Sequence, residues 1–238
     1  MDVRTKILEA AAELLTHSDS ADFSTRAVCE AAGVAAPALY RLFGDKEGLL
    51  SAVVDHGFEQ YLASKRVARP SADPVQDLRD GWDRHVAFAA QYPNYYRLMY
   101  SPGLSVPPNA AAEAHQLLLD VLERCAAAGR LAVSPHLAAQ MVMSANAGVA
   151  LSLISRPALY PDAEFSTRVR DALVEAITTD APAAEADADG VRQVSSAAAT
   201  LGAQLRAAPP KSFTHAENSL LHEWLTRLAD SAPTHTVP

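Results

Sequence analysis

The chain has 238 residues, enough for one large or two modest domains with a sizeable core, and 49% of its residues are hydrophobic. Its formal net charge of −8 argues against a nucleic-acid partner unless basic side chains gather locally. Aromatic residues make up only 6%. Alanine, which favours helices and disfavours strands, is abundant throughout, so we expect an all-α protein.

The N-terminus opens an amphipathic segment instead of a charged leader followed by an apolar core. No run of about 18 apolar residues is apparent, so we expect a cytoplasmic protein with no membrane span. The two cysteines, Cys29 and Cys125, lie far apart and form neither a metal spacing nor a disulfide framework. We expect both to be small core residues, and we expect neither a metal nor a cofactor.

The first predicted helix covers residues 2–17, where apolar side chains recur at helical spacing. Residues 23–43 then carry the signals of a helix-turn-helix. Thr25 can cap the first short helix by accepting a backbone N–H, and Gly33 supplies the left-handed position that ends it. Pro37 is tolerated only in a first helical turn, so the second helix should start one or two residues before it.

The rest of the chain is also predicted to be helical. Prolines and glycines mark the breaks between the helices. The predicted segments are residues 45–67, 74–91, 94–100, 109–129, 135–155, 162–179, 191–207 and 215–230. We expect the Ala-, Pro- and acid-rich stretch at 181–190 to be a linker and the tail at 234–238 to be disordered.

The local charge of the predicted helix-turn-helix region is not basic. Residues 1–66 hold seven basic and ten acidic side chains, a net charge of −3. Any binding to DNA must therefore rest on a few placed cations and on helix N-termini, with a strong salt dependence.

The helix-turn-helix resembles the DNA-binding domain of the tetracycline-repressor (TetR) family. The matching residues are Ala32, Gly33, Val34, Leu39, Tyr40, Phe43, Lys46, Glu47, Leu49 and Leu50. The resemblance implies that Thr25, Tyr40 and Lys46 contact phosphates. It also implies that Arg26 is part of the DNA-binding surface. The residues that would face base edges or the groove wall are Ala36, Pro37, Ala38 and Arg41. Among these four only Arg41 could make a bidentate contact to guanine.

Two positions depart from the family pattern. Many relatives carry Ser or Thr where this chain has Ala35, and His or Tyr where it has Leu42. The first departure removes a helix cap worth about 1 kcal/mol and one possible phosphate donor. Direct readout of bases should therefore be sparse, and the shape of the DNA more important.

The segment 81–100 concentrates aromatic side chains in an aromatic-poor chain and is similar to a helix pair of actinobacterial TetR-type ligand-binding domains, with W-x-x-H and Y-P-x-x-Y motifs. It could line an apolar pocket with a few polar partners, or it could simply fill the core. The pocket candidates are Trp82, His85, Phe88, Tyr92, Tyr95, Tyr96 and Met99, with Met143 and Asn146 from the helix at 135–155.

The resemblance implies a helix-turn-helix DNA-binding domain at residues 1–50. Residues 51–238 would form a helical ligand-binding and dimerisation domain, with extra C-terminal helices at about 191–230. We expect a ligand-responsive repressor that binds a palindromic double-stranded DNA operator as a homodimer, through the helices at 135–155 and 162–179. A small, mostly apolar effector would release it.

The alternative function is a helical protein-interaction module with a degenerate DNA-binding motif, which the acidic N-terminal charge favours. An enzyme is not expected. The sequence holds no Gly-rich phosphate loop, no His-Glu metal spacing and no nucleophile elbow.

Overall fold

The computed structural model describes residues 2–18, 22–66, 70–100, 109–179, 190–210 and 212–231. These residues form eleven α-helices and one short 3₁₀ helix, and within them the β structure is limited to an isolated bridge between Leu131 and Thr178. The all-α prediction is confirmed. The predicted linker, except Gly190, and the predicted disordered tail lie outside the described residues.

The chain divides into two compact units. The first comprises residues 1–69, 85–116 and 150–161, and the second comprises residues 70–84, 117–149 and 162–238. Each unit is described separately below. A domain boundary at residue 50 stays a prediction.

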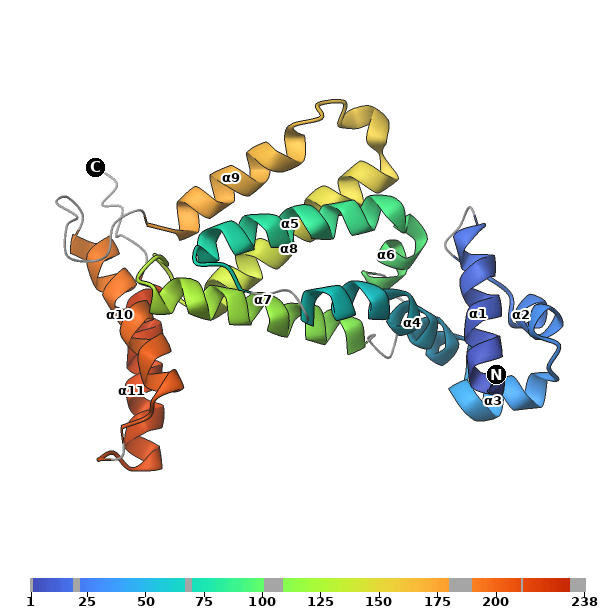
Figure 1. Ribbon diagram of the computed structural model, residues 1–238, viewed down its shortest axis with the longest axis horizontal. Helices are drawn as coiled ribbons and strands as arrows, with labels where there is room; N and C mark the ends of the chain where they lie inside the picture. Colours follow the sequence, from blue (N-terminus) through green and yellow to red (C-terminus); the bar gives the residue numbers. More distant parts are fainter. Residues whose placement is uncertain are drawn as a thin grey trace. The chain divides into compact units, whose positions relative to one another are not determined.

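The first unit begins with four helices: α1 (Val3–Thr16), α2 (Thr25–Ala32), α3 (Ala36–Phe43) and α4 (Lys46–Arg66) (Figure 1). Helix α1 packs against the other three. It buries an apolar stripe, as the helical spacing of its sequence predicts. Its buried side chains are Ile7, Leu8, Ala11 and Leu15.

Two further helices complete the core of this unit. Helix α5 (Pro74–Gln91) contributes its C-terminal half, and α6 (Pro93–Met99) packs against α4 and α1. Asn94 on α6 is buried and donates to the backbone carbonyl oxygen of Leu15 at 2.8 Å. This hydrogen bond ties the end of α1 to α6. The short 3₁₀ helix η1 (Pro157–Leu159) also belongs to the first unit.

The second unit is built on α7 (Asn109–Ala127), α8 (Pro135–Ser155) and α9 (Phe165–Ile177), although α7 begins and α8 ends in the first unit. Gly129, with a φ of 69°, adopts the left-handed conformation just after α7, as the sequence predicts. Helix α9 is shorter than the predicted 162–179. It starts late because Asp162 accepts a hydrogen bond from the backbone N–H of Glu164 and forms a turn before the helix.

The last two helices, α10 (Gly190–Ala207) and α11 (His215–Ala229), lie side by side as an antiparallel hairpin within the second unit (Figure 1). A capping box starts α11: the Thr214 hydroxyl accepts from the backbone N–H of Glu217, and the Glu217 carboxylate accepts from the backbone N–H of Thr214. The hairpin is fixed to its unit by Asp230, which accepts from the backbone N–H of Ser134 at 3.0 Å.

Helix α8 corrects the expectation that the chain has no apolar segment of about 18 residues. It is long and apolar enough to cross a membrane by length and composition alone, with a mean hydropathy of 1.6 over 18 residues. Of that window 39% is buried inside the protein, and buried helices of folded proteins meet the same criterion. The composition of α8 is therefore weak evidence for a membrane span.

Candidate nucleic-acid interface

The turn between α2 and α3 has the geometry expected of a helix-turn-helix. Gly33 ends α2 in the left-handed conformation, with φ 64° and ψ 37°. The cap of α2 differs from the prediction. Ser24, not Thr25, is the capping residue, and its hydroxyl accepts from the backbone N–H of Ala27 at 3.1 Å. Thr25 is the first residue of the helix, so its hydroxyl is not used for capping.

Helix α3 separates a packing side from an exposed side. Leu39 is fully buried, while Ala36, Pro37, Tyr40 and Arg41 are exposed. Pro37 lies in the first turn, as predicted. Ala38, also predicted to face DNA, is only half-exposed. The predicted loss of a cap is confirmed, because Ala35 precedes α3 without any side-chain capping bond.

Two hydroxyl groups from different helices meet beside the exposed side of α3. The Thr25 hydroxyl oxygen lies 3.3 Å from the Tyr40 hydroxyl oxygen. Both side chains line an open groove of about 530 Å³ between α2 and α3, together with Arg26, Gly33 and Ala36. Paired hydroxyl donors that lie next to a helix N-terminus are suited to phosphate oxygens.

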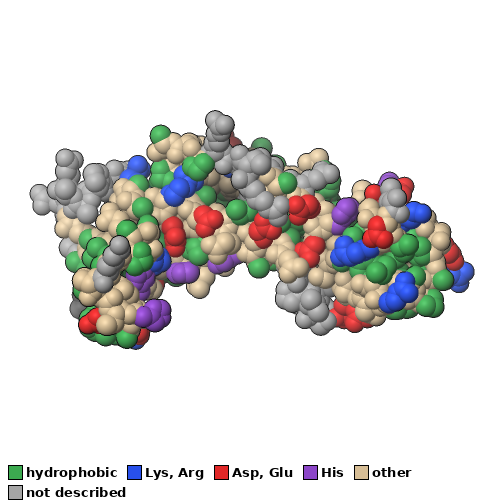
Figure 2. Space-filling view, turned by 60° about the horizontal axis from the view of Figure 1, so that its bottom comes forward, with side chains coloured by type: hydrophobic (Ala, Val, Ile, Leu, Met, Phe, Trp, Pro, Cys, Tyr) green, Lys and Arg blue, Asp and Glu red, His purple; other side chains and the backbone are tan. Residues whose placement is uncertain are grey.

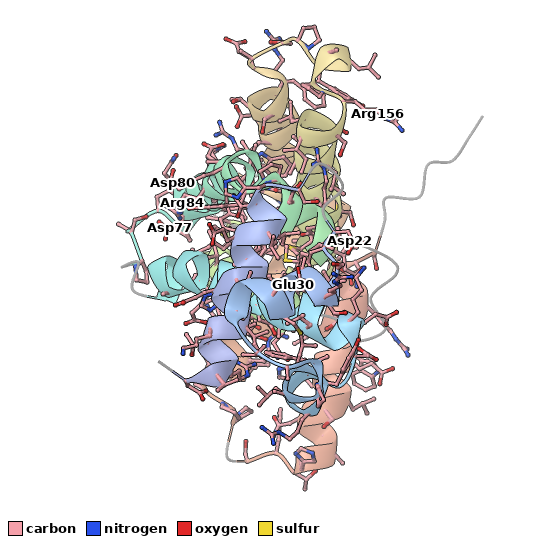
Figure 3. All side chains as sticks on the ribbon, turned by 90° about the vertical axis from the view of Figure 1, so that its right-hand side faces the viewer. Asp22, Glu30, Asp77, Asp80, Arg84 and Arg156 are labelled. Carbon is pink, nitrogen blue, oxygen red and sulfur yellow. The ribbon has the colours of Figure 1, made fainter. Side chains whose placement is uncertain are left out.

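Lys46, the predicted phosphate contact at the start of α4, already has an acidic partner. Its ammonium nitrogen lies 2.8 Å from the Asp22 carboxylate, and about half of each side chain is exposed. The hydrogen bond from Lys46 is the main cause that holds the pKa of Asp22 below its usual value. A phosphate must therefore compete with Asp22, labelled in Figure 3, for this cation.

Arg26 is also paired. Its guanidinium donates to Glu30 at 2.8 Å within α2, and both side chains are largely exposed. The Arg4 guanidinium lies 5.4 Å from the centre of the Phe43 ring, close enough for a cation–π contact. Figure 2 shows basic and acidic side chains mixed over the N-terminal helices at the right of the view. The surface of these helices is therefore not a basic patch, in agreement with the net charge of −3 counted for residues 1–66.

The predicted pocket residues of the first unit form a continuous aromatic cluster. Ring centres are 4.4 Å apart for Phe58 and Phe88, 5.1 Å for Phe88 and Tyr92, and 6.3 Å for Tyr92 and Tyr95. Phe88, Tyr95 and Met99 are buried, and Tyr92 is partly exposed. Phe58 lies in the predicted helix at 45–67 and was not among the predicted pocket residues.

A buried hydrogen-bonded chain runs through this cluster. The two ring nitrogens of His85 lie 3.1 Å from the Tyr61 hydroxyl and 2.8 Å from the Tyr96 hydroxyl. Burial raises the pKa of Tyr96 far above its ordinary value, so its hydroxyl stays neutral. The Tyr100 hydroxyl oxygen is buried in the same region with no hydrogen-bond partner in the structure.

The other predicted pocket residues, Trp82, Met143 and Asn146, belong to the second unit. Trp82 donates its indole N–H to the Ser166 hydroxyl at 3.1 Å, which joins α5 to α9. Asn146 is 4% exposed and donates to the Trp82 carbonyl oxygen at 3.4 Å, while its own amide oxygen has no partner. Met143 is half-exposed on α8.

Residues 7–53 match the model of the family described as "Bacterial regulatory proteins, tetR family". The matched segment contains the whole helix-turn-helix and the first part of α4. By this match residues 7–53 are a segment of the tetR family. The protein is a transcriptional regulator with a DNA-binding helix-turn-helix. The comparison with curated proteins finds no match.

Solved structures share the fold of this chain. A protein of unknown function from Rhodococcus sp. RHA1 shares 21% identity, covers 75% of this chain and 97% of its own, and superposes with a TM-score of 0.62. FadR from Bacillus subtilis, in complex with stearoyl-CoA, shares 18% identity, covers 71% of this chain and 97% of its own, and has a TM-score of 0.60. NalD from Pseudomonas aeruginosa, the secondary repressor of the MexAB-OprM multidrug efflux pump, shares 21% identity, covers 75% of this chain and 97% of its own, and has a TM-score of 0.52.

The alignments cover nearly all of each of these structures but leave about a quarter of this chain outside them. That share is similar to the length of the segment that follows α9. Among the residues that the structure describes, no three His, Cys, Asp or Glu side chains gather to hold a metal ion.

Proposed function

We propose that this protein is a ligand-responsive repressor that binds a palindromic operator as a homodimer and is released by a small, mostly apolar effector. The exposed side of α3 carries the proposal. Its side chains are free of the core, whereas Leu39 on the opposite side anchors the helix. A short helix presented in this way fits the major groove.

The DNA contacts divide by chemistry. Thr25 and Tyr40 offer neutral donors to phosphate, and Lys46 offers a cation once Asp22 releases it. Arg41 is exposed and has no ion pair within the described ranges, so it is the side chain available for guanine. We assign DNA binding to residues 1–50 and ligand binding and dimerisation to 51–238.

Dimerisation through α8 and α9 agrees with the outer sides of these helices. Ser144 and Gly148 are exposed on α8, and a Cβ atom added at Gly148 would meet no atom within 4 Å. The chain's own packing therefore does not require a glycine there, whereas close approach of a second helix would. On α9, Val169 and Leu173 are only half-buried. A single α3 reads few bases, and a two-fold dimer doubles its contacts.

The effector would act on the regulatory helices and shift the population between DNA-binding and non-binding states. The buried aromatic cluster of the first unit supplies apolar surface, and His85 with its two tyrosine partners supplies a few polar groups. Related folds carry such functions, since FadR is known as a stearoyl-CoA complex and NalD as a repressor. As a DNA-binding regulator the protein would work in the cytoplasm.

A gel shift with the promoter DNA next to the protein's own gene tests the proposal. We expect the full-length protein to bind this DNA and the double variant Tyr40→Phe, Lys46→Ala to lose binding. Tyr92→Phe is the matched control, because it removes an exposed tyrosine hydroxyl outside the helix-turn-helix. The ion pairs of Lys46 and Arg26 favour the alternative, an interaction module with a degenerate motif. Absence of binding by the wild-type protein would support that alternative.

The regulatory part needs a separate test. A set of small apolar compounds is screened for those that raise the melting temperature of the protein, and each is then added to the gel shift. We expect a stabilising compound to lower DNA affinity. A compound that binds the regulatory helices yet leaves DNA affinity unchanged would contradict the release mechanism.

A further inference from the structure

The α10–α11 hairpin has an exposed apolar side, which we call the hairpin face. Its five large apolar side chains are each close to half exposed. They are Val194 (51%), Leu201 (44%), Leu220 (44%), Trp224 (53%) and Leu228 (45%). Isolated apolar residues are normal on a protein surface, but a contiguous group marks an interaction site.

Helical geometry groups these residues into two stripes. Val194 and Leu201 are seven residues apart, which returns them to the same side of α10. Leu220, Trp224 and Leu228 follow each other at four-residue steps on α11. The hydroxyl of Ser195 donates to the carbonyl oxygen of Leu228, so the first residue of one stripe lies near the last of the other.

The interior of the hairpin is thin and cannot absorb these side chains. Its buried core consists of Ala198, Ala199, Leu225 and Ala229, with Leu205 and Leu221 partly buried against it. A Cβ atom added at Gly202 would lie 3.8 Å from the Leu225 Cβ atom, so the two helices already touch. The large apolar residues therefore remain outside a closed helix pair.

Charge is nearly absent from the hairpin face. No ionisable residue occurs in α10 between Gln193 and Leu205. On α11, Glu223 pairs with Arg227, and Glu217 is used in the capping box. At the end of α10, Arg206 pairs with Glu123 of α7. Two copies of this face therefore bring few like charges together.

The size of the hairpin face fits a self-interface. At these exposed fractions, five large apolar side chains present roughly 400 Å² per copy, which is the size of patch that marks an interaction surface. Two such faces would bury about 800 Å² of apolar area. Because interfaces are about 60% apolar, this corresponds to roughly 1,300 Å² in total, within the range of stable complexes.

We propose that the hairpin face pairs with the same face of a second copy of this chain. The two helix pairs then close a four-helix bundle, with Trp224 near its centre, where large aromatic residues contribute most to binding. This interface is additional to the one assigned to α8 and α9. It gives a role to the C-terminal quarter of the chain.

Tryptophan fluorescence of the full-length protein tests this pairing, because the chain has two tryptophans and only Trp224 is accessible. Trp82 is 3% exposed and is shielded within the chain itself. We expect acrylamide to quench Trp224 readily at nanomolar protein and at least threefold less at micromolar protein, where the hairpins pair. Leu201→Glu and Val194→Glu should each keep Trp224 fully quenchable at both concentrations. Circular dichroism checks that these variants stay folded.

Val3→Glu is the control, because Val3 is 42% exposed on α1 and the change adds the same charge outside the hairpin. This variant should behave as the wild type in the quenching assay. If Trp224 is equally quenchable at both concentrations, the self-pairing is wrong, and a different partner would have to cover the face. DNA binding is measured separately on the same variants, so a failure here does not bear on the proposed repressor function.

Discussion

The Lys46 ammonium lies 2.8 Å from the Asp22 carboxylate, although 24 residues separate the two in the chain. This ion pair occupies the cation that the family resemblance assigns to phosphate. A DNA phosphate that binds Lys46 has to displace Asp22, which lowers the net gain from that contact.

We therefore expect Asp22→Asn to strengthen binding to duplex DNA. The pair is about half exposed, so the change should be modest, about two- to fivefold per subunit at low salt. Fluorescence anisotropy against salt concentration measures it. Glu9→Gln is the control, since it removes an exposed acid of α1 and leaves Lys46 untouched. Equal gains from both variants would show that only net charge matters.

The Thr25–Tyr40 hydroxyl pair predicts a second effect on DNA binding. Tyr40→Phe and Thr25→Val each remove one donor from an exposed position. A hydrogen bond to a charged group contributes about 1.5 to 3 kcal/mol, so each variant should weaken DNA binding at least tenfold. Thermal unfolding should change little, because the pair is solvent-accessible. A large drop in melting temperature would instead assign the pair a structural role.

Two glycines within helices should respond in opposite directions to alanine. A Cβ atom at Gly57 would lie 2.4 Å from the ring of Tyr95, which is buried and has little room to move, so Gly57→Ala should destabilise the protein by about 1 to 3 kcal/mol. Gly81 in α5 has open space, and Gly81→Ala should stabilise by about 0.5 to 1 kcal/mol. Urea unfolding measures both. Stabilisation by Gly57→Ala would contradict the packing of Tyr95 on α4.

The two free cysteines should differ in reactivity. Cys125 is fully buried, and burial raises the pKa of its thiol to about 12, whereas Cys29 is partly exposed. A thiol reagent at pH 8 should therefore modify one cysteine in the folded protein and both after denaturation. Cys29→Ser should leave the folded protein unreactive.

The burial of Cys125 also makes the free energy of unfolding depend on pH. The folded state favours the neutral Cys125 thiol, so its contribution to stability is complete below the thiol's unfolded pKa and is lost as the pH rises toward 12. The free energy of unfolding should fall over this alkaline range. The fall should be smaller in Cys125→Ala, and an equal fall would remove Cys125 as a cause.

The sequence predicts the helices well because prolines and glycines act locally. Pro93 separates α5 from α6, and Gly33 adopts the left-handed conformation that its position requires. The assignment of the cap to Thr25 was wrong for a local reason too. Ser24 and Thr25 are adjacent hydroxyl residues, and the local pattern does not tell which one begins the helix.

The missing information is tertiary. The Lys46–Asp22 pair and the contact of Tyr61 with His85 each join residues 24 apart, so no spacing rule reveals them. Tyr61 is a buried hydrogen-bond partner of His85, and it lies outside the segment 81–100 from which the pocket residues were predicted. The sequence also does not predict that Trp224 is exposed. The amphipathic pattern of α11 indicates an apolar side but does not show what packs on it.

The most direct test of the central claim is a selection of bound sequences from a pool of random duplex DNA, with wild-type protein and Arg41→Ala side by side. We predict that the wild type enriches an inverted repeat. Arg41→Ala should lose preference at one symmetric position in each half-site, because Arg41 is the side chain of α3 that can read guanine. No enrichment by the wild type, or an unchanged motif with the variant, would contradict base readout by α3.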